Sequence, residues 1–227
     1  MSLAGTSTVI APILSRDTQA ADQGIYYTAV SPTPGTGIVN TVNMTTLAIG
    51  ELAPFLNVYN GGSATIYPLY LRLTRTVANA GNTTFGEMFT ITVDQGNRVT
   101  TIPGATGVLA ISNVNGGSPN KSLAQIYGNA AALVASAPTA QRRIVGSQRF
   151  RNGGVVGVIG DVFQFNFGST EQIDPMSLVP TGTAICNVTY GFAPVVIGPN
   201  QSLGIVYWGT GQTTAPAFEV EFAYLEK

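Results

Sequence analysis

The chain has 227 residues, of which 44% are hydrophobic and 9% charged, with ten basic and eleven acidic residues. An average globular protein has about 25% charged residues, whereas disordered chains are poor in apolar residues, so this composition predicts a folded chain with a weakly charged surface. The absence of histidine excludes Ser-His-Asp and Cys-His nucleophile pairs and histidine-ligated metals, and a single cysteine, Cys186, excludes an internal disulfide.

Residues 1–37 are predicted to form an N-terminal arm or linker that becomes ordered on a partner. They are rich in Thr, Ala, Gly and Pro and end in the loop-forming run SPTPGTG at 31–37. No basic residue precedes Arg16, and Thr, Asn, Gly and Pro interrupt the long uncharged stretches. We therefore expect neither a signal peptide nor a membrane span. Residues 38–227 are expected to form one β-sandwich domain.

Short segments in which apolar and polar residues alternate predict half-buried strands. In segment 66–77 the leucines fall on one face and polar residues on the other: Leu69, Leu71 and Leu73 against Tyr70, Arg72 and Thr74. The same alternation marks residues 87–93, 161–167, 183–190, 202–208 and 218–225, with Gly- and Asn-rich turn sequences between strands. This pattern predicts an all-β fold, an antiparallel jelly-roll-like β-sandwich.

One segment departs from the alternation and predicts a short helix near residues 122–136. Ser122, followed three residues later by Gln125, has the spacing of a capping box. Apolar residues then recur at helical spacing, at Leu123, Ile126, Tyr127, Ala130 and Val134. Pro138 would end this helix.

Carboxylates are the remaining candidates for chemistry. Glu219 and Glu221 stand two apart on a predicted strand, so both point to one face, as a glycosidase pair would require. Alternation alone explains them as a solvated face, and we expect no enzyme, no catalytic residue and no cofactor. Asp161, Glu171 and Asp174 lack EF-hand spacing, and we expect no metal, although calcium sites in sandwich loops have no fixed spacing and that alternative stays open.

Four arginines lie within ten positions and form the candidate partner-contact residues: Arg142, Arg143, Arg149 and Arg151. With Arg98 and Lys121 they give residues 95–160 six basic and no acidic side chains. Contact with an acidic protein surface and a solvated, aggregation-resistant strand edge explain them equally well. Phe150 is the only aromatic residue among them, so we do not expect nucleic-acid binding.

Seven aromatic residues offer a second kind of site, because tyrosine and tryptophan can line a sugar-binding groove. Core packing or a protein interface is the more ordinary use of such residues in strands. The seven are Tyr26, Tyr27, Tyr59, Tyr67, Tyr70, Tyr207 and Trp208.

Three segments resemble small jelly-roll virion proteins of tailed bacteriophages. Residues 198–209 (GPNQSLGIVYWG) and 218–226 (FEVEFAYLE) resemble the last two strands of that family, and residues 149–151 with 160–168 (GDVFQFNFG) resemble a middle strand. The resemblance implies a sandwich that decorates or cements a capsid, often as a trimer, through extended interfaces and without catalytic residues.

The sequence therefore leads us to expect a structural virion protein, made in the host cytoplasm without a signal peptide and located on the capsid surface. As a decoration or cement protein it would bind the outer shell and bridge major capsid protein subunits as a homo-oligomer, with a trimer favoured, and without a membrane. Two alternatives stay open: a carbohydrate- or receptor-binding jelly-roll module of a phage tail or fibre, and a glycosidase that uses Glu219 and Glu221.

Overall fold

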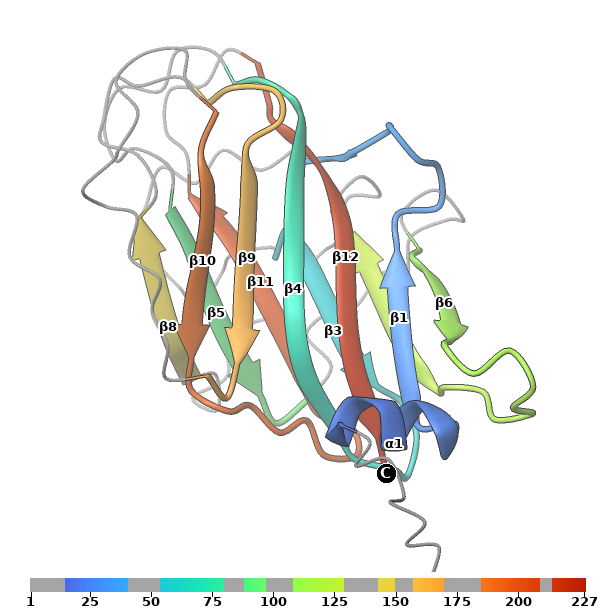
Figure 1. The fold of residues 1–227 in the computed structure, drawn as a ribbon. Coiled ribbons are helices and arrows are strands. Elements are labelled where there is room, and N and C mark those ends of the chain that lie inside the picture. Colours follow the sequence, from blue (N-terminus) through green and yellow to red (C-terminus); the bar gives the residue numbers. More distant parts are fainter. Residues whose placement is uncertain are drawn as a thin grey trace, which may run out of the picture.

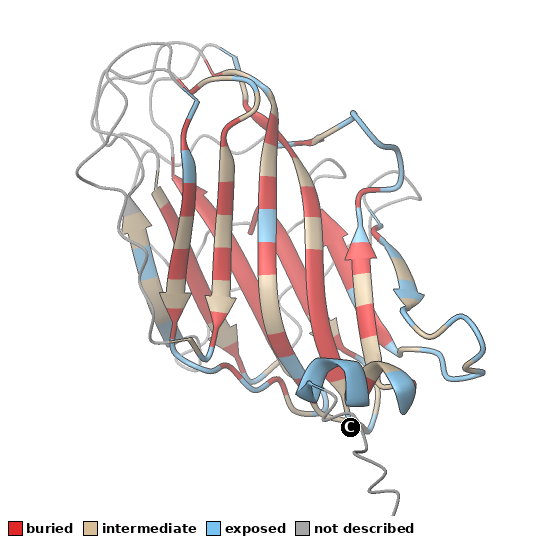
Figure 2. Cartoon of the chain, in the orientation of Figure 1, coloured by how far each residue is buried: buried red, intermediate tan, exposed pale blue. Residues whose placement is uncertain are grey.

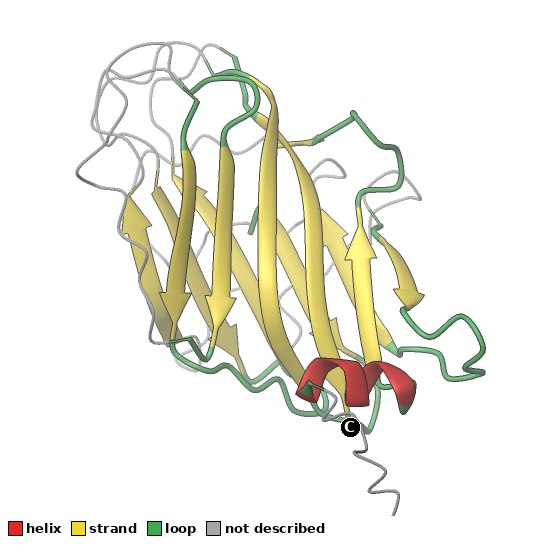
Figure 3. Cartoon of the chain, viewed as in Figure 1, coloured by secondary structure: helices red, strands yellow, loops and turns green. Residues whose placement is uncertain are grey.

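The computed structural model describes residues 15–40, 54–79, 88–96, 108–128, 143–149, 157–169, 185–208 and 214–227. In this part of the chain two β-sheets pack face to face, and the single helix lies at one end of the sandwich (Figures 1 and 3). The all-β sandwich predicted from the alternation of apolar and polar residues is confirmed.

The larger sheet has seven strands and the smaller has five. Across the larger sheet the order is β10 (Asn187–Phe192), β9 (Val162–Phe167), β4 (Ile66–Val77), β12 (Ala217–Glu226), β1 (Tyr26–Val30) and β6 (Ala110–Asn113), with the short β2 (Ile38–Val39) paired to β12. Across the smaller sheet it is β7 (Ala124–Gly128), β3 (Leu56–Asn60), β11 (Ser202–Trp208), β5 (Met88–Asp94) and β8 (Arg143–Arg149). Pairing between the described strands is antiparallel except between β9 and β10, which are parallel.

Eight of the strands follow the order of a jelly roll. We number β1, β3, β4, β5, β8, β9, β11 and β12 from first to eighth. One sheet then has the order first, eighth, third, sixth, and the other has second, seventh, fourth, fifth. This is the double Greek key of jelly-roll proteins. Strands β6, β7 and β10 extend the sheets at their edges. In the interior, β11 lies between β3 and β5, and β12 lies between β4 and β1.

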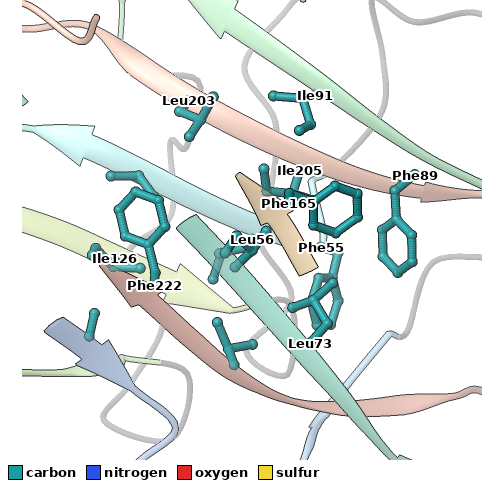
Figure 4. Close-up of a cluster of buried hydrophobic side chains, with 14 of the residues drawn as sticks. Phe55, Leu56, Leu73, Phe89, Ile91, Ile126, Phe165, Leu203, Ile205 and Phe222 are labelled. Carbon is teal, nitrogen blue, oxygen red and sulfur yellow. The ribbon is translucent and has the colours of Figure 1, made fainter. Parts of the chain in front are cut away.

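The core lies between the inner faces of the sheets, where large apolar side chains from both interdigitate (Figure 4). Along β9 buried positions alternate with half-buried ones, and along β4 with half-buried or exposed ones, whereas β12 alternates only from Phe218 to Phe222 and is buried continuously from Phe222 to Leu225 (Figure 2). Phe89 is central to this core, because its ring centroid lies 5.1–5.8 Å from four other aromatic rings. Those rings belong to Phe163, Phe165, Tyr207 and Phe218.

The predicted helix near 122–136 is wrong where the structure describes it, because residues 124–128 form β7 and pair antiparallel with β3. Ser122 Oγ accepts a hydrogen bond from the amide of Ala124, two residues on, instead of capping a helix. The free edge of β3 supplies a ladder of backbone hydrogen bonds, and Ala124 and Ile126 are buried around an exposed Gln125. Tertiary pairing thus overrides a weak helical pattern, and residues 129–136 lie outside the described part.

The N-terminal region also differs from the expected arm of residues 1–37. Residues Arg16–Asp22 form helix α1, capped by the side chain of Ser15, which accepts from the amide of Thr18. Strand β1 then pairs on both sides, with β12 and β6. The expected domain boundary at residue 38 therefore falls too late, since residues 26–30 already belong to the sheet; residues 1–14 lie outside the described part.

Candidate functional site

The outer face of the larger sheet is polar where its two longest strands meet. The register places Arg72 of β4 opposite Glu221 of β12, and Thr74 opposite Glu219. Because alternate residues of a strand share a face, these four side chains lie on the side away from the core, together with Tyr70. The alternation seen in the sequence predicted this face for each strand separately.

Glu221 is the centre of a small network on this face. It pairs with Arg72 through Oε2 and accepts a hydrogen bond of 2.5 Å from the hydroxyl of Tyr70 through Oε1. Burial, the hydrogen bond to Glu221 and the charge of that carboxylate raise the pKa of Tyr70 well above 10. Burial and the charges of Asp17 and Glu221 also raise the pKa of Tyr26, which lies on the same face.

The loop between β1 and β2 is anchored over this face. The amide of Gly35 donates to Oε1 of Glu219 (2.5 Å), and Gly35 has φ +77°, a conformation that favours glycine. Ser31 and Val220 exchange two hydrogen bonds, from the Ser31 amide to the Val220 carbonyl (3.0 Å) and from the Val220 amide to Ser31 Oγ (2.9 Å). These bonds hold the loop against β12.

Between this loop and the two strands lies an open pocket of about 310 Å³, which we call the β4–β12 pocket. It is lined by Val30, Ser31, Pro34, Arg72, Thr74, Glu219, Val220 and Glu221. The carboxylate pair identified in the sequence is thus brought together with an arginine and two hydroxyls. The sequence did not indicate these additional groups, because they come from a strand and a loop far from β12 in the chain.

The tyrosines give the protein a predictable response to alkaline pH. Burial raises the pKa of Tyr70 and of Tyr224 above the ordinary value near 10. Above pH 10 the unfolded chain therefore binds fewer protons than the folded chain, and stability falls as pH rises. We expect a Tm that is steady below pH 10 and falls above it, with a shallower fall in Tyr70→Phe.

Thermal unfolding of the unchanged protein and of Tyr70→Phe between pH 8 and 11.5, followed by circular dichroism, measures this response. The difference in Tm between the two proteins at pH 7 gives the effect of losing the hydroxyl itself, before any tyrosine ionises. Equal slopes above pH 10 would contradict a role for Tyr70.

A second cluster of polar groups lies inside the sandwich, at the end of β4. Arg75 Nε donates to Oδ2 of Asp161 (3.2 Å), and both side chains have no solvent exposure. The same carboxylate accepts from the amides of Val158 (2.9 Å) and Cys186 (2.8 Å). The Arg75 guanidinium also lies 4.7 Å from the ring centroid of Phe218. This pair joins β4 to the starts of β9 and β10, which indicates a structural role.

The sequence contains a signal for one member of this pair. Arg75 follows Leu71 and Leu73 at the same alternation and so occupies an inward position. A buried arginine requires a partner, which a single sequence does not identify. Asp161, considered above for calcium, is this partner; Glu171 and Asp174 lie outside the described residues. Among the residues that the structure describes, no group of three or more potential metal ligands is found.

The four candidate arginines are only partly described. β8 forms an edge of the smaller sheet, since β5 is the one described strand that pairs with it. Arg143 is exposed near the start of β8, and Arg149 pairs with Met88 at its other end. Arg142 and Arg151 lie outside the described residues. The edge position agrees with both interpretations of the arginines, a partner contact and a protected edge.

The seven aromatic candidates do not form one groove. Tyr27 and Tyr207 are buried in the core, and Trp208 is buried with its indole N–H donating to Thr90 Oγ1 (2.7 Å). Tyr59 lies on the smaller sheet, where its hydroxyl donates to Oδ1 of Asn200. The remaining tyrosines lie on the larger sheet: Tyr26, Tyr67 and Tyr70. Cys186 is buried.

The described residues therefore define a jelly-roll protein with a polar pocket on one sheet and a basic edge strand on the other. Comparison with protein-family models, curated proteins and solved structures finds no match for this chain. Within the described part of the chain, no helix is long and apolar enough to cross a membrane.

Proposed function

We propose that the protein is a structural virion protein, a capsid decoration or cement protein that binds the outer shell and bridges major capsid protein subunits. The observation that carries this proposal is the strand order, because two four-stranded sheets in double Greek key order are the architecture of many viral capsid domains. Lectin domains and cupins share that architecture, and fold alone does not decide function.

Surface composition favours the virion role among these uses. Only 9% of the residues are charged, as suits a surface that works covered by partners. Ile159 and Ile185 precede the adjacent parallel strands β9 and β10, and each is 61% exposed. They place two exposed apolar side chains side by side at one end of the larger sheet, where a partner surface would cover them. The chain has no histidine for a metal site of the cupin kind.

Immunogold labelling tests the proposal directly. Antibody to the purified protein is applied to particles from cells that make it, with pre-immune serum as the control. We expect gold over the particle heads, because a decoration protein covers the shell in many copies. Label confined to tails would contradict the decoration role, and particles without label would overturn the virion role.

The basic edge provides a second test within this proposal. A variant in which Arg142, Arg143, Arg149 and Arg151 are all replaced by Ala is expected to co-sediment less with particles than the unchanged protein. The matched control is Lys121→Ala, which removes an exposed positive charge outside the cluster. Equal co-sedimentation of all three proteins would refute a contact role for the arginines and leave the protected edge as their explanation.

A further inference from the structure

We propose that the β4–β12 pocket binds an uncharged saccharide. This inference goes beyond the virion role and does not depend on it, since the pocket is formed by one chain. At about 310 Å³ the pocket lies at the lower end of the range for small-molecule sites, about 300–1,000 Å³, which suits one or two sugar rings.

The pocket offers hydrogen-bond donors and acceptors at close quarters. Arg72 makes one hydrogen bond among the described residues, to Glu221, so most of its five N–H groups remain available. Glu219 uses Oε1 for the Gly35 amide, which leaves Oε2 as an acceptor. The hydroxyl of Thr74 lines the pocket and makes no hydrogen bond within the described part of the chain. A sugar hydroxyl is both donor and acceptor, so a saccharide can use all of these groups.

The charges of the pocket argue against an ionic ligand. An anion would meet the carboxylates of Glu219 and Glu221, while the one guanidinium of the pocket, Arg72, is already paired with Glu221. A cation would find only the Glu219 carboxylate outside that ion pair, and its Oε1 already accepts from the Gly35 amide. A metal ion would need several convergent oxygen ligands, whereas Glu221 is already committed to Arg72 and Tyr70. A neutral ligand with many hydroxyls avoids these repulsions and still receives charge-assisted hydrogen bonds, which are stronger than neutral ones.

The rim of the pocket provides an apolar surface as well. Val30 is 40% exposed at the end of β1, and Pro34 lies in the anchored loop. The C–H face of a pyranose ring can pack on such side chains while its hydroxyl edge reaches Arg72 and Glu219. Because Gly35 and Ser31 bind β12, the loop holds this surface in place before a ligand arrives.

Saturation-transfer NMR and titration with the purified protein test this site. The probes are glucose, galactose, mannose and N-acetylglucosamine, with N-acetylneuraminic acid as the anionic comparison and glucosamine as the cationic one. We expect saturation transfer from the protein to at least one neutral sugar at millimolar concentration, and weaker transfer to both charged sugars.

Two pocket variants and a matched control locate the binding. Glu219→Gln keeps an acceptor for the Gly35 amide but removes the charge. We expect about tenfold weaker saccharide binding, because one charge-assisted hydrogen bond is lost. Thr74→Val keeps the shape of the side chain and removes the hydroxyl, and we expect it to weaken saccharide binding about fivefold. The control is Thr189→Val, the same change on β10 outside the pocket. Circular dichroism spectra confirm that all variants are folded.

Three outcomes would overturn the proposal: no transfer to any neutral sugar, preferential binding of a charged sugar, or equal affinity in all three variants. Each of these leaves the immunogold result unaffected, so failure of the saccharide site and failure of the virion role are distinguishable.

Discussion

Replacing Asp161 with Asn is expected to lower the free energy of unfolding by about 3–5 kcal/mol. The substitution keeps the shape of the side chain but removes the negative charge that Asp161 places beside the Arg75 guanidinium, and neither side chain reaches solvent. A change of this size is a large part of the total stability of a domain, about 5–15 kcal/mol. Chemical denaturation with urea, followed by circular dichroism, measures it.

Two further variants separate the charge from other effects of the substitution. Arg72→Met breaks the ion pair with Glu221 on the outer face, where the arginine side chain is 47% exposed, and is expected to cost less than about 1 kcal/mol. The double variant Arg75→Met with Asp161→Asn removes both charges and keeps an amide oxygen as an acceptor beside the Val158 and Cys186 amides, and it is expected to be more stable than Asp161→Asn alone. If Asp161→Asn and Arg72→Met unfold at the same urea concentration, the buried pair does not have the assigned role.

Phe89→Ala is expected to destabilise the protein by about 3–5 kcal/mol, because it removes a large side chain from a rigid aromatic surround. Four ring centroids lie within 5.8 Å of the Phe89 ring, and the ring comes from β5 while Phe163, Phe165 and Phe218 come from the opposite sheet. The resulting cavity would lie between the two sheets, where the surrounding side chains fill it only in part. The same urea titration measures the loss.

Ile144→Ala is the control for this truncation. Ile144 is 50% exposed on the edge strand β8, and a surface truncation of this kind is expected to stay within about 0.5 kcal/mol. Equal effects of the two truncations would contradict the central position of Phe89 in the core.

Local alternation was enough to predict where several strands lie, although β11, expected to be half-buried, is buried at every position. Segments 66–77 and 202–208 coincide with β4 and β11, and the expected face of Tyr70, Arg72 and Thr74 is confirmed. It failed at residues 124–128, where the strand is short and is stabilised by pairing with β3. The segment Tyr26–Val30 is too short to show a distinctive pattern. It forms a strand by pairing with β12 and β6, which come from distant parts of the sequence.

The site was predictable only in part for the same reason. The period of two placed Glu219 and Glu221 on one face. That Arg72 lies opposite Glu221 depends on the register between two strands whose paired residues are 149 positions apart, which no local pattern specifies. The loop that completes the pocket was predicted as loop from its Pro and Gly residues, but its attachment to Glu219 through Gly35 became visible only in three dimensions.

The interior position of β12 has a consequence for the order in which the chain can fold during synthesis. β12 lies between β4 and β1, so these two strands cannot be joined into one sheet until residues 217–226 have left the ribosome. Until then β4 and β1 each present an unpaired edge, a template for pairing with other chains. Chains that stop short of β12 are therefore expected to aggregate and to require chaperones, whereas complete chains bury both edges in one step.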